Sequence, residues 1–194
     1  MDSRLELPQN PGNEVYCGSD LHFGHDKLIE LAPRPVDFEQ RIFRNYMQVP
    51  WKPGDTLINC GDMALYPRGH KLAEEFNQSL KTLGVHLVLV KGNHDPKSIF
   101  RCQRLGFDVA LDAMRLVFHG KDLYFTHEPA GVLGNTINIH GHLHDLDGHR
   151  GSLARDGKHI LLSSELMDYR PISLTRLLQI GTPRWVNGKF ERAE

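Results

Sequence analysis

Apolar residues along the first half of the chain alternate between strand-length runs and segments of helical spacing. Residues 15–17, 56–60 and 85–90 form short β-prone or continuously apolar runs, each followed by a glycine and polar residues. Between these runs, apolar residues recur every three or four positions over 38–49 and 72–83, which predicts two helices. Asp37 and Gln40 are placed like a capping pair at the start of the first helix.

The second half is richer in predicted strands. Residues 115–119 and 122–126 flank Gly120 and Lys121, a pattern typical of a β-hairpin. Residues 136–140 and 159–163 have the composition of further strands, and 171–180 is predicted to be a short helix. Strands separated by helices and then a strand-rich half indicate an α/β protein with a mixed sheet or two packed sheets.

Composition narrows the class of protein. The chain has 194 residues, 40% of them hydrophobic, and we expect one domain over 1–194. A net charge of −1 argues against a strongly basic partner for long nucleic acids or membranes. Three cysteines far apart in sequence indicate neither a disulfide framework nor a zinc ribbon. Without a signal-like segment or a run of ~18 apolar residues, we expect a cytoplasmic protein. Its ends, about 1–12 and 189–194, are expected to be mobile.

Polar clusters follow the predicted strands in five places. They are Asp20-Leu21-His22, Gly61-Asp62, Gly92-Asn93-His94-Asp95, Thr126-His127-Glu128 and His140-Gly141-His142-Leu143-His144. Ligands of open α/β sheets bind outside the carboxyl ends of the strands, so these clusters are candidates for one site. Carboxylates, an amide and imidazoles without thiolates suit Mn²⁺, Fe or Zn²⁺, and Ni²⁺ less obviously. In an extended segment, Asp20 and His22 would point to the same side, as would His142 and His144.

Each cluster alone has an ordinary structural explanation. Gly61-Asp62 is a common turn dipeptide, and Asn93 or Asp95 could cap a helix that follows the strand. A single histidine such as His127 is more often a hydrogen-bonded polar residue than a ligand. Five such clusters in this order, each at the end of a predicted strand, are difficult to obtain by chance.

The series resembles the five-motif signature of the calcineurin-like metallophosphoesterases, and within that family the small single-domain bacterial and phage enzymes. The resemblance spans residues 20–144. It implies a four-layer α/β/β/α sandwich of two mixed β-sheets flanked by helices, with two divalent metal ions. By motif position, one ion would be held by Asp20, His22 and His144. The other would be held by Asn93, His127 and His142. Asp62 would bridge the two ions.

The resemblance also implies the reaction. A hydroxide bridging the two ions would attack a phosphoric ester, and His94 would contact the phosphate and protonate or stabilise the leaving oxygen. Two divalent ions carry four positive charges, and two carboxylate ligands and the hydroxide cancel three of them. The site therefore keeps about one positive charge and attracts phosphate. Mn²⁺ is the first expectation for the metal, with Fe, Zn²⁺ or Ni²⁺ as alternatives. His25 is expected to contact substrate, either at a phosphate oxygen or on the leaving side.

Substrate class and activity stay open between alternatives. Diesters are favoured over monoesters because no evident arginine cluster accompanies the motifs; a small phosphoester or nucleotide fits better than long nucleic acid. An inactive metal-binding scaffold is a less favoured alternative, since every ligand position is filled. Leu65 stands where protein phosphatases carry the Asp that orients the catalytic His, so His94 needs other support. Other charged residues between and after the motifs are expected to be surface or structural: Arg34, Arg41, Arg44, Arg68, Glu165 and Asp168. The oligomeric state does not follow from the sequence.

Overall fold

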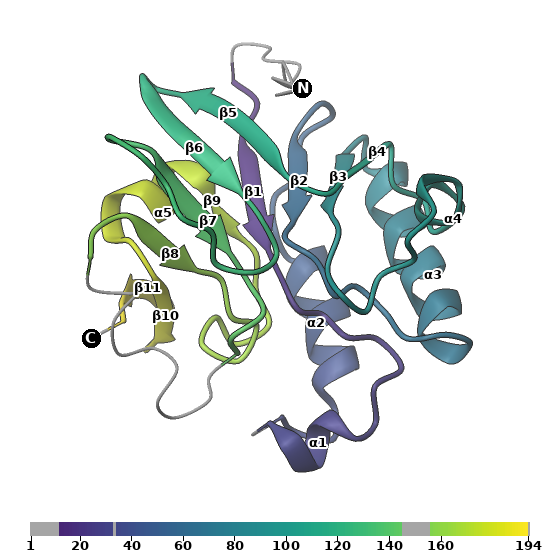
Figure 1. The fold of residues 1–194 in the computed structure, drawn as a ribbon. Helices are drawn as coiled ribbons and strands as arrows, with labels where there is room; N and C mark the ends of the chain where they lie inside the picture. Colours follow the sequence, from purple (N-terminus) through teal and green to yellow (C-terminus); the bar gives the residue numbers. More distant parts are fainter. Residues whose placement is uncertain (1–11, 33, 145–155, 194) are drawn as a thin grey trace.

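The computed structural model of the chain describes residues 12–32, 34–144 and 156–193. Its centre is a pair of β-sheets, with helices on the outside (Figure 1). The first sheet has, in order across it, β4 (Val109–Leu111), β3 (His86–Val90), β2 (Thr56–Asn59), β1 (Val15–Gly18) and β9 (Ile172–Ser173). Neighbouring strands are parallel except β9, which runs antiparallel to β1.

The second sheet is also mixed. It contains β5 (Met114–Phe118), β6 (Lys121–Phe125), β7 (Ile137–His140) and β8 (His159–Leu161) in that order. The hairpin pair β5 and β6 is antiparallel, whereas β6, β7 and β8 are parallel. A separate hairpin consists of β10 (Pro183–Val186) and β11 (Lys189–Arg192). The predicted fold class, two mixed sheets flanked by helices, is confirmed.

Alternating side chains of the first sheet belong to two different cores. Cys17, Ile58 and Val88 face the second sheet, where they pack with residues such as Phe125 and Ile139. Their neighbours on the opposite face pack against helices. This period of two explains why the central strands are apolar at almost every position: both faces of the sheet are covered.

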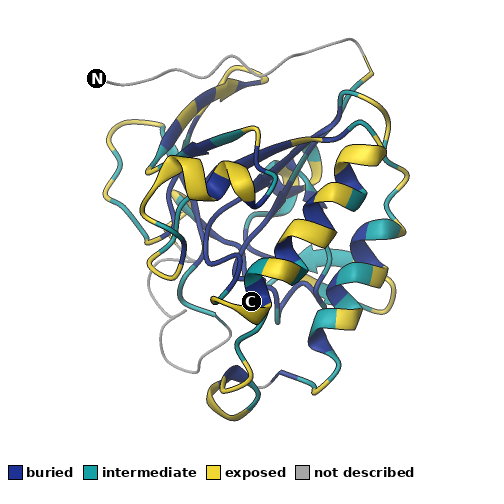
Figure 2. Cartoon of the chain, turned by 90° about the vertical axis from the view of Figure 1, so that its right-hand side faces the viewer, coloured by how far each residue is buried: buried dark blue, intermediate teal, exposed yellow. Residues whose placement is uncertain are grey.

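Three helices form the second core with the outer face of the first sheet. They are α2 (Phe38–Met47), α3 (Arg68–Thr82) and α4 (Ile99–Arg104). Phe76 of α3 contacts the rings of Phe23, Phe43 and Tyr46, and this aromatic cluster ties α2 to α3. Figure 2 shows the buried stripe of the helices turned inward and their exposed residues outward. The remaining helices are α1 (Leu28–Leu31) and α5 (Leu174–Ile180), which packs near β1 and β9.

Local expectations differ from the structure at several points. Asp37 precedes α2, but its side chain caps no backbone amide and instead pairs with Arg41, 2.9 Å away. The expected C-terminal tail 189–194 begins with strand β11, because Phe190 packs on Trp185 of the facing strand.

The expected mobile stretch 1–12 lies outside the described residues apart from residue 12. The single-domain organisation stays a prediction. In the described ranges, no helix is long and apolar enough to cross a membrane.

Candidate metal centre

Loops at the carboxyl ends of five parallel strands carry the motif residues. Asp20 and His22 follow β1, Asp62 follows β2, and Asn93 follows β3. From the second sheet, His127 follows β6, and His142 and His144 follow β7. Because β1, β2 and β3 are parallel and in register, their ends coincide, and the second sheet places its own loops opposite them.

Main-chain hydrogen bonds hold these loops against one another. The Asp20 and His22 amides donate to the carbonyls of Gly61 and Asp62, each at 2.9 Å. The Gly141 amide donates to the His127 carbonyl at 3.0 Å, and the His142 amide donates to the Asp20 carboxylate at 3.1 Å. A Cβ at Gly141 would overlap Ser19 Oγ and Asp20 Oδ2, so only glycine allows the loops to approach this closely.

The backbone of the motif residues is not extended, contrary to our expectation from the alternating spacing. Five of them have a positive φ: Asp20 at 56°, His22 at 52°, Asp62 at 54°, His142 at 71° and His144 at 50°. Residues other than glycine rarely adopt this left-handed conformation, and it costs on the order of 1–3 kcal/mol at each position. Strain of this kind clusters at functional sites, where surrounding structure over-determines the geometry.

Among the described residues, two groups of three side chains have ligand atoms within 4.8 Å of one another. The first group is Asp20, His22 and His144, and the second is Asp62, His127 and His142. In the first, the Nε2 atoms of His22 and His144 both lie 3.8 Å from Asp20 Oδ1. In the second, His127 Nε2 lies 3.1 Å from His142 Nδ1 and 3.0 Å from Asn93 Oδ1.

Asp62 lies between the two groups. Its Oδ2 is 3.3 Å from His127 Nε2 in its own group and 3.4 Å from His22 Nε2 in the other. The residues predicted as ligands are therefore brought together as two triads with Asn93 beside the second and a shared carboxylate. Their metal-binding roles stay predictions, since geometry alone does not assign them.

The donor set fits a pair of divalent cations. His22 is 1% exposed, yet neither of its ring nitrogens makes a hydrogen bond in the described part of the chain. Buried polar atoms are normally satisfied, so an orphaned imidazole facing two carboxylates is suited to binding a cation. Oxygen and imidazole donors without sulfur match the borderline-hard divalent metals.

Burial and neighbouring charges move the pKa values of these groups in opposite directions. Burial would lower the pKa of His127, but its interactions with Asp62 and the charge of Asp20 outweigh burial and raise that pKa to about 9. Burial depresses the pKa of His22 strongly, and nearby Arg34 adds to the effect. The imidazole is therefore neutral, and a ring nitrogen can offer its lone pair to a metal ion. Burial raises the pKa of Asp20.

Residues outside the motifs orient the histidines. The Nδ1 atom of His127 lies 2.8 Å from the Cys60 carbonyl, which leaves Nε2 facing the cluster. The Nδ1 atom of His144 lies 3.0 Å from Glu165 Oε1. A partner on one ring nitrogen fixes the tautomer and the orientation of the other, as in many metal sites.

Glu165 and Arg34 form a buried ion pair behind the first group. Arg34 Nε donates to Glu165 Oε1 at 2.7 Å, and its two terminal nitrogens donate to the carbonyls of Leu21 and Asp20. Arg34 is 4% exposed, so the expectation of a surface charge is wrong for this residue. The Arg34 guanidinium and His144 outweigh burial and hold the Glu165 pKa well below its ordinary value. Neither residue belongs to one of the five motifs, and nothing in the local sequence indicates that they pair.

The other charged candidates form ion pairs with residues outside the cluster or are exposed. Arg41 pairs with Asp37, Arg68 pairs with Glu39 and Asp26, and Arg44 is exposed. Asp168 is partly exposed and interacts with Arg41 and Arg170.

Asp95 connects the loops that follow β2 and β3, and it caps no helix. Its carboxylate accepts hydrogen bonds from the amides of Asp62, Met63 and Gly92, each at 2.8 Å. The Asp62 carboxylate in turn accepts from the amide of His94 at 2.9 Å. These hydrogen bonds fix the loop that carries Asp62 to the loop over residues 92–95.

His94 and His25 lie at the mouth of the cluster. The His94 side chain is 39% exposed, and its Nε2 lies 4.0 Å from Asp62 Oδ2. Its ring contacts those of His22 and His25, with centroids 5.2 and 5.7 Å away. The ring of His25 also contacts that of His22, with the centroids 5.5 Å apart, so both residues border the cluster. The Asp62 carboxylate is a charged neighbour of the His94 ring, whereas Leu65 supplies no charge.

The sequence matches the model of a known protein family. A family model for calcineurin-like phosphoesterases matches residues 15–186. No curated protein matches the chain. Among solved structures, a protein of unknown function from Aquifex aeolicus, AQ665, is 27% identical, covers 87% of this chain and 99% of its own, and has a TM-score of 0.72. The phosphoesterase YfcE from E. coli is 19% identical over 66% of this chain and 69% of its own, with a TM-score of 0.42.

Proposed function

The chain belongs to the calcineurin-like phosphoesterase family, and we propose that it hydrolyses phosphodiesters with two divalent cations. The observation that carries the proposal is the position of Asp62, whose Oδ2 lies 3.4 Å from His22 Nε2 and 3.3 Å from His127 Nε2. A carboxylate between two imidazole-rich groups is the arrangement that a pair of ions needs.

The residues divide between the two ions by proximity. One ion would take Asp20, His22 and His144, and the other would take Asn93, His127 and His142; Asp62 would be shared. When bound, the cations supply a nucleophilic hydroxide near neutral pH and neutralise charge on the phosphoryl oxygens. Only two of these seven side chains are carboxylates, so the site remains attractive to an anionic phosphate.

His94 would act on the ester itself. Its exposed imidazole lies at the mouth of the cluster, and a hydrogen bond from its backbone amide to the Asp62 carboxylate fixes the main chain there. From there it would donate a proton or a hydrogen bond to the oxygen that leaves phosphorus. His25, whose ring neighbours that of His94, would contact the same side of the substrate.

Diesters are proposed ahead of monoesters because the arginine beside the cluster is not free to bind a phosphate group. A dianionic monoester is best held by guanidinium groups, and the arginine nearest the first group, Arg34, is buried and fully engaged with Glu165 and two carbonyls. A nucleotide phosphatase that cleaves monoesters is the second candidate, and an inactive metal-binding scaffold of the same fold is the third.

Turnover of two chromogenic esters tests the proposal. We expect the purified protein, loaded with Mn²⁺, Ni²⁺, Zn²⁺ or Mg²⁺ in turn, to hydrolyse bis-p-nitrophenyl phosphate faster than p-nitrophenyl phosphate. EDTA should abolish this activity, and His94→Ala should lower it, while His86→Ala, on the exposed start of β3, serves as the matched control. No turnover of either ester with any ion would refute the enzyme proposal. Faster turnover of the monoester would favour the phosphatase.

A further inference from the structure

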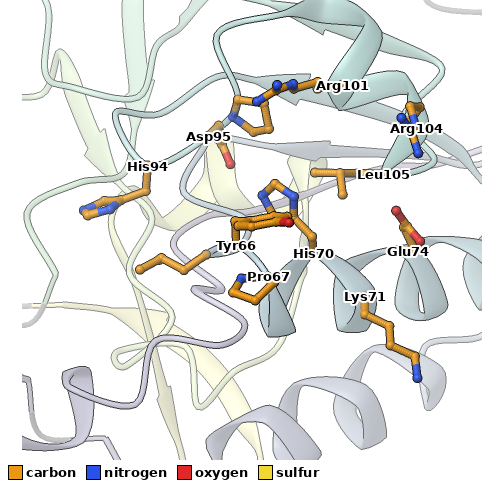
Figure 3. Close-up of a pocket in the computed structure, with 12 residues that line it drawn as sticks. Tyr66, Pro67, His70, Lys71, Glu74, His94, Asp95, Arg101, Arg104 and Leu105 are labelled. Atoms are coloured by element: carbon orange, nitrogen blue, oxygen red, sulfur yellow. The ribbon is translucent and has the colours of Figure 1, made fainter.

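A cavity of about 910 Å³ opens beside His94, on the side of the molecule that carries α3 and α4. Loop residues 65–67, the turn 94–96 and the two helices line it. Figure 3 shows His94 at one end, with Glu74 and Arg104 at the other. The cavity therefore begins beside the residue that we propose as the proton donor to the leaving oxygen.

Tyr66 presents an aromatic surface to this cavity. It is 81% exposed although its ring is large, and it contacts the ring of His70 edge-on, with the centroids 5.4 Å apart. Both rings line the cavity. Exposed aromatic rings of this kind provide stacking surfaces for nucleobases, whatever the base.

Positive charge accumulates farther along the same cavity. Arg101 and Arg104 project from α4, three residues apart and therefore on one face of that helix. In the described part of the chain, neither guanidinium has an ion-pair partner. Lys71 of α3 also lines the cavity, but its Nζ lies 3.9 Å from the Glu75 carboxylate on the same helix. Two carboxylates, Glu74 and Asp95, also line the cavity, but that of Asp95 is buried and turned to three backbone amides.

We propose that this cavity binds the leaving group of the substrate, and that this leaving group is a nucleotide with its own phosphate. The base would stack on Tyr66, and the second phosphate would bind Arg101 and Arg104. The volume accommodates a nucleotide, since small-molecule sites commonly enclose about 300–1,000 Å³. The inference rests on the proposed function, because it assigns the substrate of the same site.

The reaction then balances as an ordinary hydrolysis. The oxygen of water forms a bond to the phosphorus between two nucleosides, and the bond from that phosphorus to the leaving nucleotide's sugar oxygen breaks. A proton moves to this sugar oxygen, and the nucleotide with its second phosphate leaves through the cavity. No other reactant is needed.

Three dinucleotides test the assignment with the metal-loaded protein. Thymidylyl-thymidine (TpT) has no terminal phosphate, whereas pTpT and TpTp carry one at the 5′ or the 3′ end. We expect kcat/KM for pTpT or TpTp to exceed that for TpT by about tenfold or more, as a charge-assisted contact implies. The products should identify the phosphate-bearing nucleotide as the leaving group. From pTpT we expect thymidine 5′-phosphate and no thymidine 3′,5′-bisphosphate. From TpTp we expect thymidine 3′-phosphate.

Substitutions locate the preference in the cavity. Arg101→Gln with Arg104→Gln should reduce the ratio of kcat/KM values to about one. The control, Arg44→Gln with Arg184→Gln, removes two exposed arginines of α2 and β10 and should keep the ratio. Tyr66→Ala should raise KM for all three dinucleotides, and Tyr66→Phe should restore it.

The outcomes separate this inference from the proposed function. If bis-p-nitrophenyl phosphate is hydrolysed but the terminal phosphate gives no preference, the nucleotide assignment is wrong and the phosphodiesterase stands. A preference that survives the Arg101 and Arg104 substitutions also overturns it. If no ester is hydrolysed with any ion, both proposals fail together.

Discussion

Removing the charge of Glu165 should destabilise the protein and weaken one metal site at the same time. The side chain is 3% exposed and accepts hydrogen bonds from Arg34 Nε at 2.7 Å and Ser163 Oγ at 2.8 Å. It also holds His144 Nδ1 at 3.0 Å. Glu165→Gln keeps the shape but replaces one acceptor oxygen by an NH₂ group, so one buried donor loses its acceptor and Arg34 loses its counter-charge.

The magnitude follows from the burial of the pair. Removing one partner of a buried ion pair costs about 3–5 kcal/mol, against about 5–15 kcal/mol for the unfolding of a whole domain. Mutating a partner that orients a metal-binding His lowers metal affinity by about 10–100-fold. We therefore expect Glu165→Gln to be folded but markedly less stable, with one of two metal equivalents bound more weakly.

Denaturant unfolding and metal competition measure the two effects separately. Glu191→Gln removes a carboxylate from the exposed pair with Lys189 and should cost about 1 kcal/mol or less, so it is the matched control. Ser163→Ala, which removes a milder contact of Glu165, should fall between them. A loss of less than about 1 kcal/mol in Glu165→Gln, with both metal affinities unchanged, would refute the positioning role of Glu165.

Three further changes test the site and the fold. His94→Ala should lower turnover by about 10²–10⁴-fold while two metal equivalents remain bound, measured by steady-state kinetics and elemental analysis; loss of metal would contradict its assigned role. Asn93→Asp adds a negative charge and should weaken inhibition by inorganic phosphate, so a tighter inhibition constant would count against the charge argument. Burial would raise the pKa of Asp108, but hydrogen bonds from Lys81 and the Leu87 amide lower it. Its stabilising effect is therefore present above the ordinary Asp pKa of about 3.9 and lost as pH falls through the lowered value. The difference in unfolding free energy between the wild type and Asp108→Asn should shrink in that acid range, and a difference that grows would show that the sign is wrong.

The motif residues could be predicted from sequence because each lies just after a parallel strand. Strand ends meet at one edge, so Asp20, Asp62 and Asn93 converge whatever the details of their loops. The local conformation could not be predicted. Glycine-like φ values at His142 and His144 depend on main-chain bonds between loops distant in sequence, and no spacing rule reveals them.

Long-range partners were also beyond the sequence. Arg34 and Glu165 are 131 residues apart, and each alone has the appearance of a surface residue; only the folded chain buries them together. Strand β4 has three residues and β9 has two, too few for a periodic pattern. Arg101 and Arg104 belong to no motif, so their place in the cavity beside His94 required the positions of α3 and α4.

A crystal structure of the Mn²⁺-loaded protein, with anomalous scattering from the metal, tests the central claim most directly. We expect two anomalous peaks about 3.5–4 Å apart, with Asp62 bound to both. His22 should ligate the ion that Asp20 and His144 bind, and His127 the ion that Asn93 and His142 bind. A single peak, or two peaks without Asp62 between them, would contradict the account.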